Sequence, residues 1–98
     1  MIDFLKKYGI TDKVIQEIKK LNSNANLYNL NCNQDEAIKI IQCLRDKGVT
    51  CVEELLMYKI DLFFMDFDSF KNGYLKQDVE NFVKQINDDY LKINEFYN

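Results

Sequence analysis

The stretch that decides the fold is AIKIIQCLRDKGVT, residues 37–50. Its apolar side chains recur at helical spacing, and Gly48 follows them at a position where glycine adopts the left-handed conformation at low cost. Val49 comes next and is placed to pack back on the finished helix. Thr50 then stands at an N-cap position, with Glu53 three residues later as its capping-box partner. The stretch therefore predicts a helix that stops at a glycine turn and leads directly into another helix.

Similar signals recur on both sides of this stretch. Gly9 and Gly73 are each followed by a larger apolar residue, and Thr11 again occupies a cap position. Asn33 and Glu36 form a further box-like pair, with asparagine as the capping residue. We therefore expect helices over residues 3–8, 12–21, 34–47, 51–58, 61–70 and 76–87, and a last one over 88–96.

Periodicity between these signals is helical, and alternation of period two is almost absent. The asparagine-rich residues 22–33 are expected to form a connecting loop with Leu27, Tyr28 and Leu30 turned inward. The sequence predicts an all-α fold, either a compact bundle or a short helical array of five to seven short helices. We expect it to form a single domain over residues 1–98, built around the helix at 61–70.

Composition excludes several kinds of catalytic site. The chain has 98 residues, no histidine and a formal charge of −3. Without histidine, serine and cysteine triads and histidine-bound zinc are ruled out. The three cysteines are expected to be reduced thiols, with Cys43 in the core and Cys51 in a helix first turn that lowers its pKa. No glycine-rich phosphate loop is present. We expect no enzyme, no catalytic residue, no cofactor, no metal and no small-molecule substrate.

Targeting signals are absent from the sequence as given. The first residues lack the charged start and apolar run of a signal peptide, and the longest apolar run covers only residues 62–65. These features predict a cytoplasmic protein that does not span a membrane. The bias toward lysine, asparagine, isoleucine and tyrosine indicates an AT-rich genome, and we expect a bacterial source.

An aromatic segment, LFFMDFDSF at residues 62–70, is the strongest candidate for function. Phe63, Phe67 and Phe70 share one helical stripe, whereas Phe64 and Met65 point away from it. One alternative is that the whole segment is buried at the centre of a bundle. The other is that exposed aromatic and methionine side chains bind a protein partner or a second copy. The residues of that surface would be Met57, Tyr58, Phe64 and Met65. The C-terminal aromatic residues within 90–97 either dock the last helix or contact a partner.

Two glycine segments echo each other at an offset of 39 residues: LKKYGIT at 5–11 and LRDKGVT at 44–50. With the helices that follow, they resemble the helical repeats of the mitochondrial transcription termination factor family and its bacterial look-alikes, over residues 1–65. The resemblance implies binding of duplex nucleic acid through phosphate contacts. The candidate residues are Lys6, Lys7, Lys13, Lys19 and Lys20. The sequence departs from the family in having no proline and a single arginine, and its acidic total charge opposes phosphate binding.

A second resemblance, FDSFKNGYL at residues 67–75, is to the middle of an EF-hand loop. Asp68 and Gly73 match loop positions 1 and 6, but Phe70 and Val79 stand where position 3 and position 12 need oxygen ligands. A turn at Asn72 and Gly73 explains the same residues. We expect first a non-catalytic protein-interaction module, whether or not it also associates with itself. The second alternative is a nucleic-acid-binding protein, and the third is a calcium-binding module.

Overall fold

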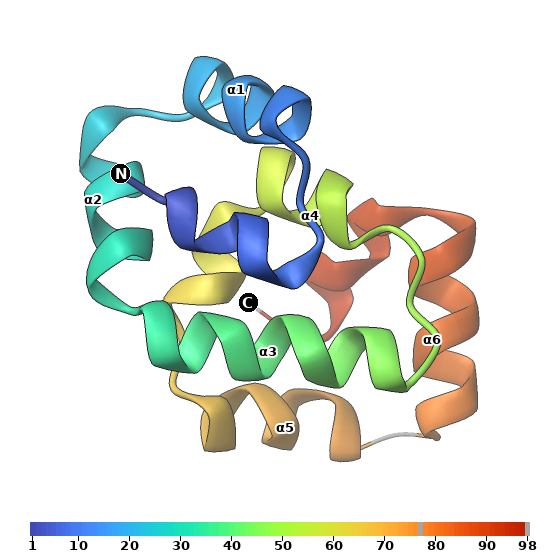
Figure 1. Cartoon of the computed structure of the whole chain (residues 1–98). Coiled ribbons are helices and arrows are strands. Elements are labelled where there is room, and N and C mark those ends of the chain that lie inside the picture. Colours follow the sequence, from blue (N-terminus) through green and yellow to red (C-terminus); the bar gives the residue numbers. More distant parts are fainter. Residues whose placement is uncertain (77, 98) are drawn as a thin grey trace.

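The chain folds as a succession of short helices joined by tight connections (Figure 1). The computed structural model describes residues 1–76 and 78–97. In chain order the helices are η1 (Asp3–Tyr8), α1 (Asp12–Leu21), α2 (Asn24–Cys32), α3 (Gln34–Asp46), α4 (Val52–Tyr58), η2 (Ile60–Phe64), α5 (Phe67–Leu75), α6 (Val79–Asp88) and η3 (Tyr90–Glu95), the η elements being 3-10 helices. These residues include no strand, so the predicted all-α fold is confirmed.

Helix α3 is the centre of the arrangement. It contacts η1, α2, α4, η2 and α5, and it crosses the front of the molecule in Figure 1 with η1 above it and α5 below it. The prediction that the fold is built around a helix at 61–70 is therefore wrong. Phe63 and Phe70 from that segment are nevertheless fully buried, and all the buried side chains form one apolar cluster.

The glycine signals at two of the three positions are confirmed. Gly9 and Gly48 both have positive φ, 84° and 97°, and each follows a helix. Thr11 caps α1, because its Oγ1 accepts from the backbone N–H of Val14 at 3.3 Å. Gly73 does not end a helix but lies inside α5. The expected turn at Asn72 and Gly73 is therefore wrong.

Residues 22–33 form a helix where we expected a loop. Ser23 caps α2 by accepting from the backbone N–H of Asn26 at 3.1 Å. Leu27 and Leu30 of α2 are buried as expected, but Tyr28, which we also expected to turn inward, is 59% exposed. Asparagine has low helix propensity, but burial of this leucine pair outweighs it. Helix α2 is therefore an addition to the helices that we expected in this part of the chain.

The helix expected at 61–70 is two helices. η2 ends at Phe64, Met65 is extended with ψ of 153°, and Asp66 caps α5 by accepting from the backbone N–H of Ser69 at 3.2 Å. An aspartate cap and an extended residue before it stop one helix and begin the next.

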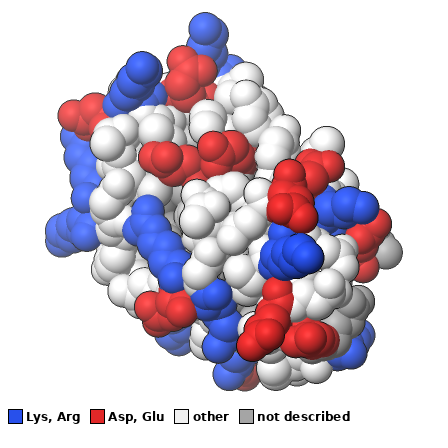
Figure 2. Space-filling model, turned by 90° about the vertical axis from the view of Figure 1, so that its right-hand side faces the viewer, with Lys and Arg blue, Asp and Glu red and all other residues white. Residues whose placement is uncertain are grey.

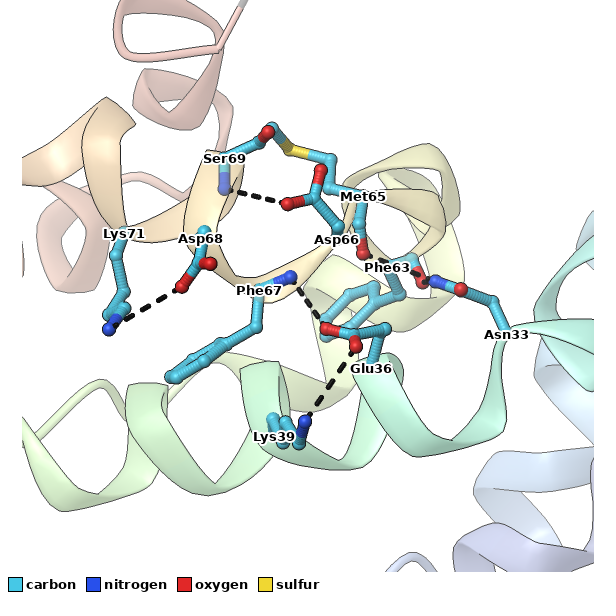
Figure 3. Close-up of polar contacts among 10 residues, drawn as sticks. All are labelled: Asn33, Glu36, Lys39, Phe63, Met65, Asp66, Phe67, Asp68, Ser69 and Lys71. Carbon is cyan, nitrogen blue, oxygen red and sulfur yellow. Dashed lines mark hydrogen bonds and ion pairs between the residues drawn. The ribbon is translucent and has the colours of Figure 1, made fainter.

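The two predicted capping boxes do not form, and the side chains of Asn33, Glu36 and Thr50 hydrogen-bond to other segments. The Asn33 amide donates to the carbonyls of Phe63 and Met65 at 2.9 and 3.2 Å. The Glu36 carboxylate accepts from the backbone N–H of Phe67 at 2.6 Å. Figure 3 shows both side chains reaching from the start of α3 to the connection between η2 and α5.

The other box, at Thr50 and Glu53, is replaced by a contact with α6. The backbone N–H and the hydroxyl of Thr50 both lie within hydrogen-bond distance of Asn87 Oδ1, at 2.8 and 3.2 Å. The Asn87 amide in turn donates to the Gly48 carbonyl at 3.0 Å. The glycine turn after α3 is thus tied to α6. The expected helix at 76–87 includes Gln77, which lies outside the described residues, and α6 begins at Val79.

Candidate protein-interaction surface

A groove of about 560 Å³ is lined by residues of η2, of α5 and of the segment 93–97. Its apolar lining comes from Leu62, Met65, Ile93, Phe96 and Tyr97, and polar and charged groups of both signs, including Lys59, Asp61 and Lys76, lie among them. One wall of the groove is therefore made by residues 90–97, which we call the C-terminal strap.

The C-terminal strap is docked, which settles one of the open alternatives. Ile93 on η3 is buried, and the Phe96 ring meets Phe82 of α6 edge-on with ring centroids 4.8 Å apart. Tyr97 stacks on Phe70 of α5 at 5.4 Å with the ring planes 1° apart. The Tyr97 hydroxyl also donates to the Phe70 carbonyl.

Gly73 leaves free the space on α5 that the Tyr97 ring occupies. A β-carbon at position 73 would lie 2.2 Å from Cε1 of the Tyr97 ring, closer than any two such atoms can come. We expected Gly73 in a turn, but it instead allows α5 and the strap to approach each other closely, because it has no side chain. We call Phe70 and Gly73 the α5 socket.

An exposed aromatic surface lies where α4 meets the strap. Tyr58, 52% exposed at the end of α4, stacks on Tyr90 at 5.6 Å, and the adjacent Leu91 is 49% exposed. We call Tyr58, Tyr90 and Leu91 the aromatic surface. Two exposed large apolar side chains beside a half-buried tyrosine form a contact area of the kind enriched at protein interfaces.

The four residues predicted as a partner surface are not equivalent in the structure. Tyr58 belongs to the aromatic surface, and half-buried Met65 lines the groove. Met57 and Phe64 are half-buried against the core, and the Met57 carbonyl accepts from the Asn22 amide at 3.1 Å. The aromatic segment 62–70 is therefore buried at Leu62, Phe63 and Phe70 and half-buried at Phe64, Met65 and Phe67.

The sequence prediction missed Tyr90, Leu91 and Gly73 as parts of this region. The cluster of aromatic residues in 90–97 was the signal for Tyr90 and Tyr97. No sequence signal pairs Gly73 with Tyr97, because that contact joins α5 to a strap more than twenty residues away.

The N-terminal lysines are divided between η1 and α1, and two of them have carboxylate partners. Lys6 Nζ lies 2.8 Å from Asp12, and Lys19 Nζ lies 3.6 Å from Asp3. The single arginine, Arg45, donates to the Tyr8 carbonyl and so joins the two echoing glycine segments. Charge elsewhere is mixed: Figure 2 shows basic and acidic side chains interspersed over the face of α6.

The cysteines are all free thiols. Burial, followed by the nearby Glu54 carboxylate, raises the pKa of Cys51, which corrects our expectation of a lowered value. Cys43 is half-buried between α3 and α5, where its sulfur lies 3.3 Å from the Tyr74 hydroxyl. Burial and this contact raise the pKa of Tyr74 to about 12. Cys51, with its raised pKa, therefore lacks the setting of a reactive cysteine. Cys43 lines a hollow together with Lys39, Lys47 and Lys71, with Asp46 as the one carboxylate in its lining.

The segment that resembles an EF-hand loop is helical. Asp68 and Gly73 both lie in α5, and the Asp68 carboxylate pairs with Lys71 on the same helix at 3.8 Å. Across residues 1–76 and 78–97, no three cysteine, aspartate or glutamate side chains come together as a metal site. No helix in this part of the chain is long and apolar enough to cross a bilayer.

Comparison of the chain with protein families, with curated proteins and with solved structures yields no match. The resemblance to the mitochondrial transcription termination factor repeats therefore stays a prediction.

Proposed function

We propose that this protein is a non-catalytic protein-interaction module and that its contact area is the aromatic surface. The observation that supports this proposal most directly is the stack of exposed Tyr58 on Tyr90, which exposed Leu91 follows in the chain. Both elements are tied to the core, since Leu55 and Leu56 of α4 and Ile93 of η3 are buried. The aromatic rings are therefore held in place before a partner arrives, which lowers the entropic cost of binding.

Charge indicates the chemistry of the partner. Residues 50–98, which supply the whole aromatic surface, carry ten acidic residues against five lysines. The net negative charge of this segment favours a partner with a net positive charge, and it disfavours a phosphate backbone. The N-terminal lysines remain the candidate contact for nucleic acid, and no contact in the structure favours that alternative.

The test is affinity capture with three forms of the protein, each split into nuclease-treated and untreated halves. Tyr58→Asp places a charge in the aromatic surface, and Tyr28→Asp makes the same change at an exposed tyrosine of α2. We expect one stoichiometric protein that survives nuclease, is retained by Tyr28→Asp and falls at least about tenfold with Tyr58→Asp. Equal capture by both variants would refute the aromatic surface as the contact area. Capture that disappears with nuclease would replace the proposal by nucleic-acid binding.

A further inference from the structure

A hollow of about 380 Å³ is lined by residues of α3, of its C-cap and of α5, which runs beside α3 (Figure 1). Its volume is within the range of small-molecule sites, roughly 300–1,000 Å³. It shares no residue with the aromatic surface. We call it the basic hollow, and its lining residues are Lys39, Gln42, Cys43, Asp46, Lys47, Phe67, Lys71 and Tyr74.

The two helices contribute matching faces to the basic hollow. Lys39, Cys43 and Asp46 follow one another at intervals of four and three residues on α3. Phe67, Lys71 and Tyr74 repeat these intervals on α5. Residues at this spacing share one side of a helix, so the lining combines one face of each helix.

The basic hollow has an excess of positive charge in an acidic protein. Its three lysines stand against the single carboxylate of Asp46, a formal charge of +2, whereas the whole chain carries −3. The lysines belong to two helices, and thus no single helix face accounts for the cluster. A concave site lined by charges of one sign raises the local concentration of ions of the opposite sign.

The lysines of the basic hollow are only weakly neutralised by their neighbours. Lys39 Nζ lies 3.7 Å from Glu36 and Lys71 Nζ lies 3.8 Å from Asp68, each within its own helix. Exposed pairs of this kind contribute little to stability and are readily exchanged. Within residues 1–76 and 78–97, no ion pair includes Lys47. All three ammonium groups are therefore available to an anion.

The pair of Tyr74 and Cys43 adds an uncharged donor. Tyr74 is only 4% exposed, and its hydroxyl lies 3.3 Å from Cys43 Sγ, where either group can donate. The contact uses one of the two hydrogens, so the other is left for a further acceptor. Ammonium groups together with a hydroxyl or thiol donor make the short, strong hydrogen bonds that hold oxyanions.

From these observations we infer that the basic hollow binds a small anion that carries more than one negative charge, a phosphorylated or polycarboxylate compound. The anion contacts Lys39 and Lys47 on one side and Lys71 on the other, in place of the pairs with Glu36 and Asp68. A long polyanion such as duplex nucleic acid also meets the net negative charge of the rest of the molecule, which opposes its binding. The inference concerns binding alone and does not depend on the proposed function.

Titration of the wild-type protein at low salt tests the site directly. Inorganic pyrophosphate and citrate are the two probes, and amide chemical shifts are followed by nuclear magnetic resonance. We expect saturable shifts concentrated at the lining residues of α3 and α5. Saturation by only one probe supports the site and identifies the ligand class. Shifts that do not saturate, or that concentrate elsewhere, overturn the inference.

A matched pair of variants separates the basic hollow from the overall charge. Lys39→Gln/Lys47→Gln removes two charges from the hollow, and Lys13→Gln/Lys20→Gln removes two from exposed positions on α1. We expect the first to raise the Kd of the saturating probe at least about tenfold and the second to leave it within about twofold. Equal weakening by both variants overturns the inference. A short DNA duplex that binds more tightly than either probe, and only with the hollow lysines intact, would replace it by nucleic-acid binding.

The thiol of Cys43 gives a readout that needs no variant. Uncharged iodoacetamide alkylates free thiols, and peptide mass spectrometry measures Cys43 and exposed Cys32 in the same sample. The saturating probe should slow the alkylation of Cys43 at least about threefold, because it covers the sulfur and neutralises the lysines that favour the thiolate. Cys32, outside the hollow, should react at an unchanged rate. An unchanged rate at Cys43 would contradict occupation of the basic hollow.

Discussion

At the scale of single residues, Gly73 has the clearest consequence. Alanine is the better helix former by roughly 0.5–1 kcal/mol, so a helix interior alone would favour Gly73→Ala. Here the new methyl group would meet the Tyr97 ring, and overpacking of this kind typically costs about 1–3 kcal/mol. We therefore expect a net destabilisation of about 1–2 kcal/mol in urea unfolding.

Two variants make that prediction specific to the clash. Asn72→Ala, an exposed neighbour on the same helix, should be neutral or slightly stabilising, because it keeps only the propensity gain. Adding Tyr97→Ala to Gly73→Ala should remove the penalty for the clash, so that the two changes are not additive. If the stability changes of the two substitutions simply added, Gly73 would affect stability independently of its contact with the strap.

The buried tyrosines predict how stability depends on pH. Burial raises the pKa of Tyr74 to about 12 and raises that of Tyr97 as well, whereas an unfolded tyrosine titrates near pH 10. The folded state holds these protons more tightly, so the stability they contribute is complete below about pH 10 and is lost as pH rises toward 12. Urea midpoints at pH 8, 10 and 11 should fall in that order.

Lysine deprotonation acts in the same pH range, and phenylalanine variants separate the two effects. Tyr74→Phe and Tyr97→Phe keep the rings but have no proton to lose. Each should flatten the decline between pH 10 and pH 11, and a decline as steep as that of the wild type would contradict the assignment.

At the scale of elements, the connection between η2 and α5 depends on α3. The Asn33 amide donates to the carbonyls of Phe63 and Met65, and the Glu36 carboxylate accepts from the Phe67 N–H (Figure 3). Asn33→Ala leaves both carbonyls without this donor, a loss that typically costs about 1–3 kcal/mol for buried groups. We expect a destabilisation of about 1–2 kcal/mol in urea and faster hydrogen exchange at the Phe67 amide.

Asn29→Ala is the matched control for this prediction, since Asn29 is an exposed asparagine of α2. It should leave both the urea midpoint and the Phe67 exchange rate close to wild type. Unchanged exchange in Asn33→Ala would show that the extended residue and the Asp66 cap alone hold the two helices apart.

At the scale of the whole molecule, one core connects all parts of the fold. The buried residues run from Ile2 to Ile93 in one cluster, and the Cα radius of gyration is 12.6 Å, against about 13 Å for a typical domain of 100 residues. We expect one cooperative unfolding transition at low protein concentration. Far-ultraviolet dichroism should report the helices, and the fluorescence of the six tyrosines should report their tertiary packing, with coincident midpoints. An earlier tyrosine transition would show that part of the molecule unfolds separately.

Much of the local structure was predictable from neighbouring residues. Gly9, Gly48 and Thr11 act through their own backbone or through a partner three residues away, so their roles follow from local rules. The failures share a cause. Asn33 and Glu36 were predicted to cap their own helix but bind a segment about thirty residues away, and Gly73 was predicted from its turn propensity but responds to Tyr97.

The sequence by itself determined the all-α fold and two of its glycine turns, because helical periodicity and left-handed glycines depend on contacts within a few residues. The missing histidine likewise excluded whole classes of catalysis without any structure. Only the tertiary structure decided that 22–33 is a helix, that 61–70 is two, and that Tyr58 is exposed while Phe63 is buried. Those outcomes depend on which distant side chains meet, and local propensities are too weak to decide them against packing.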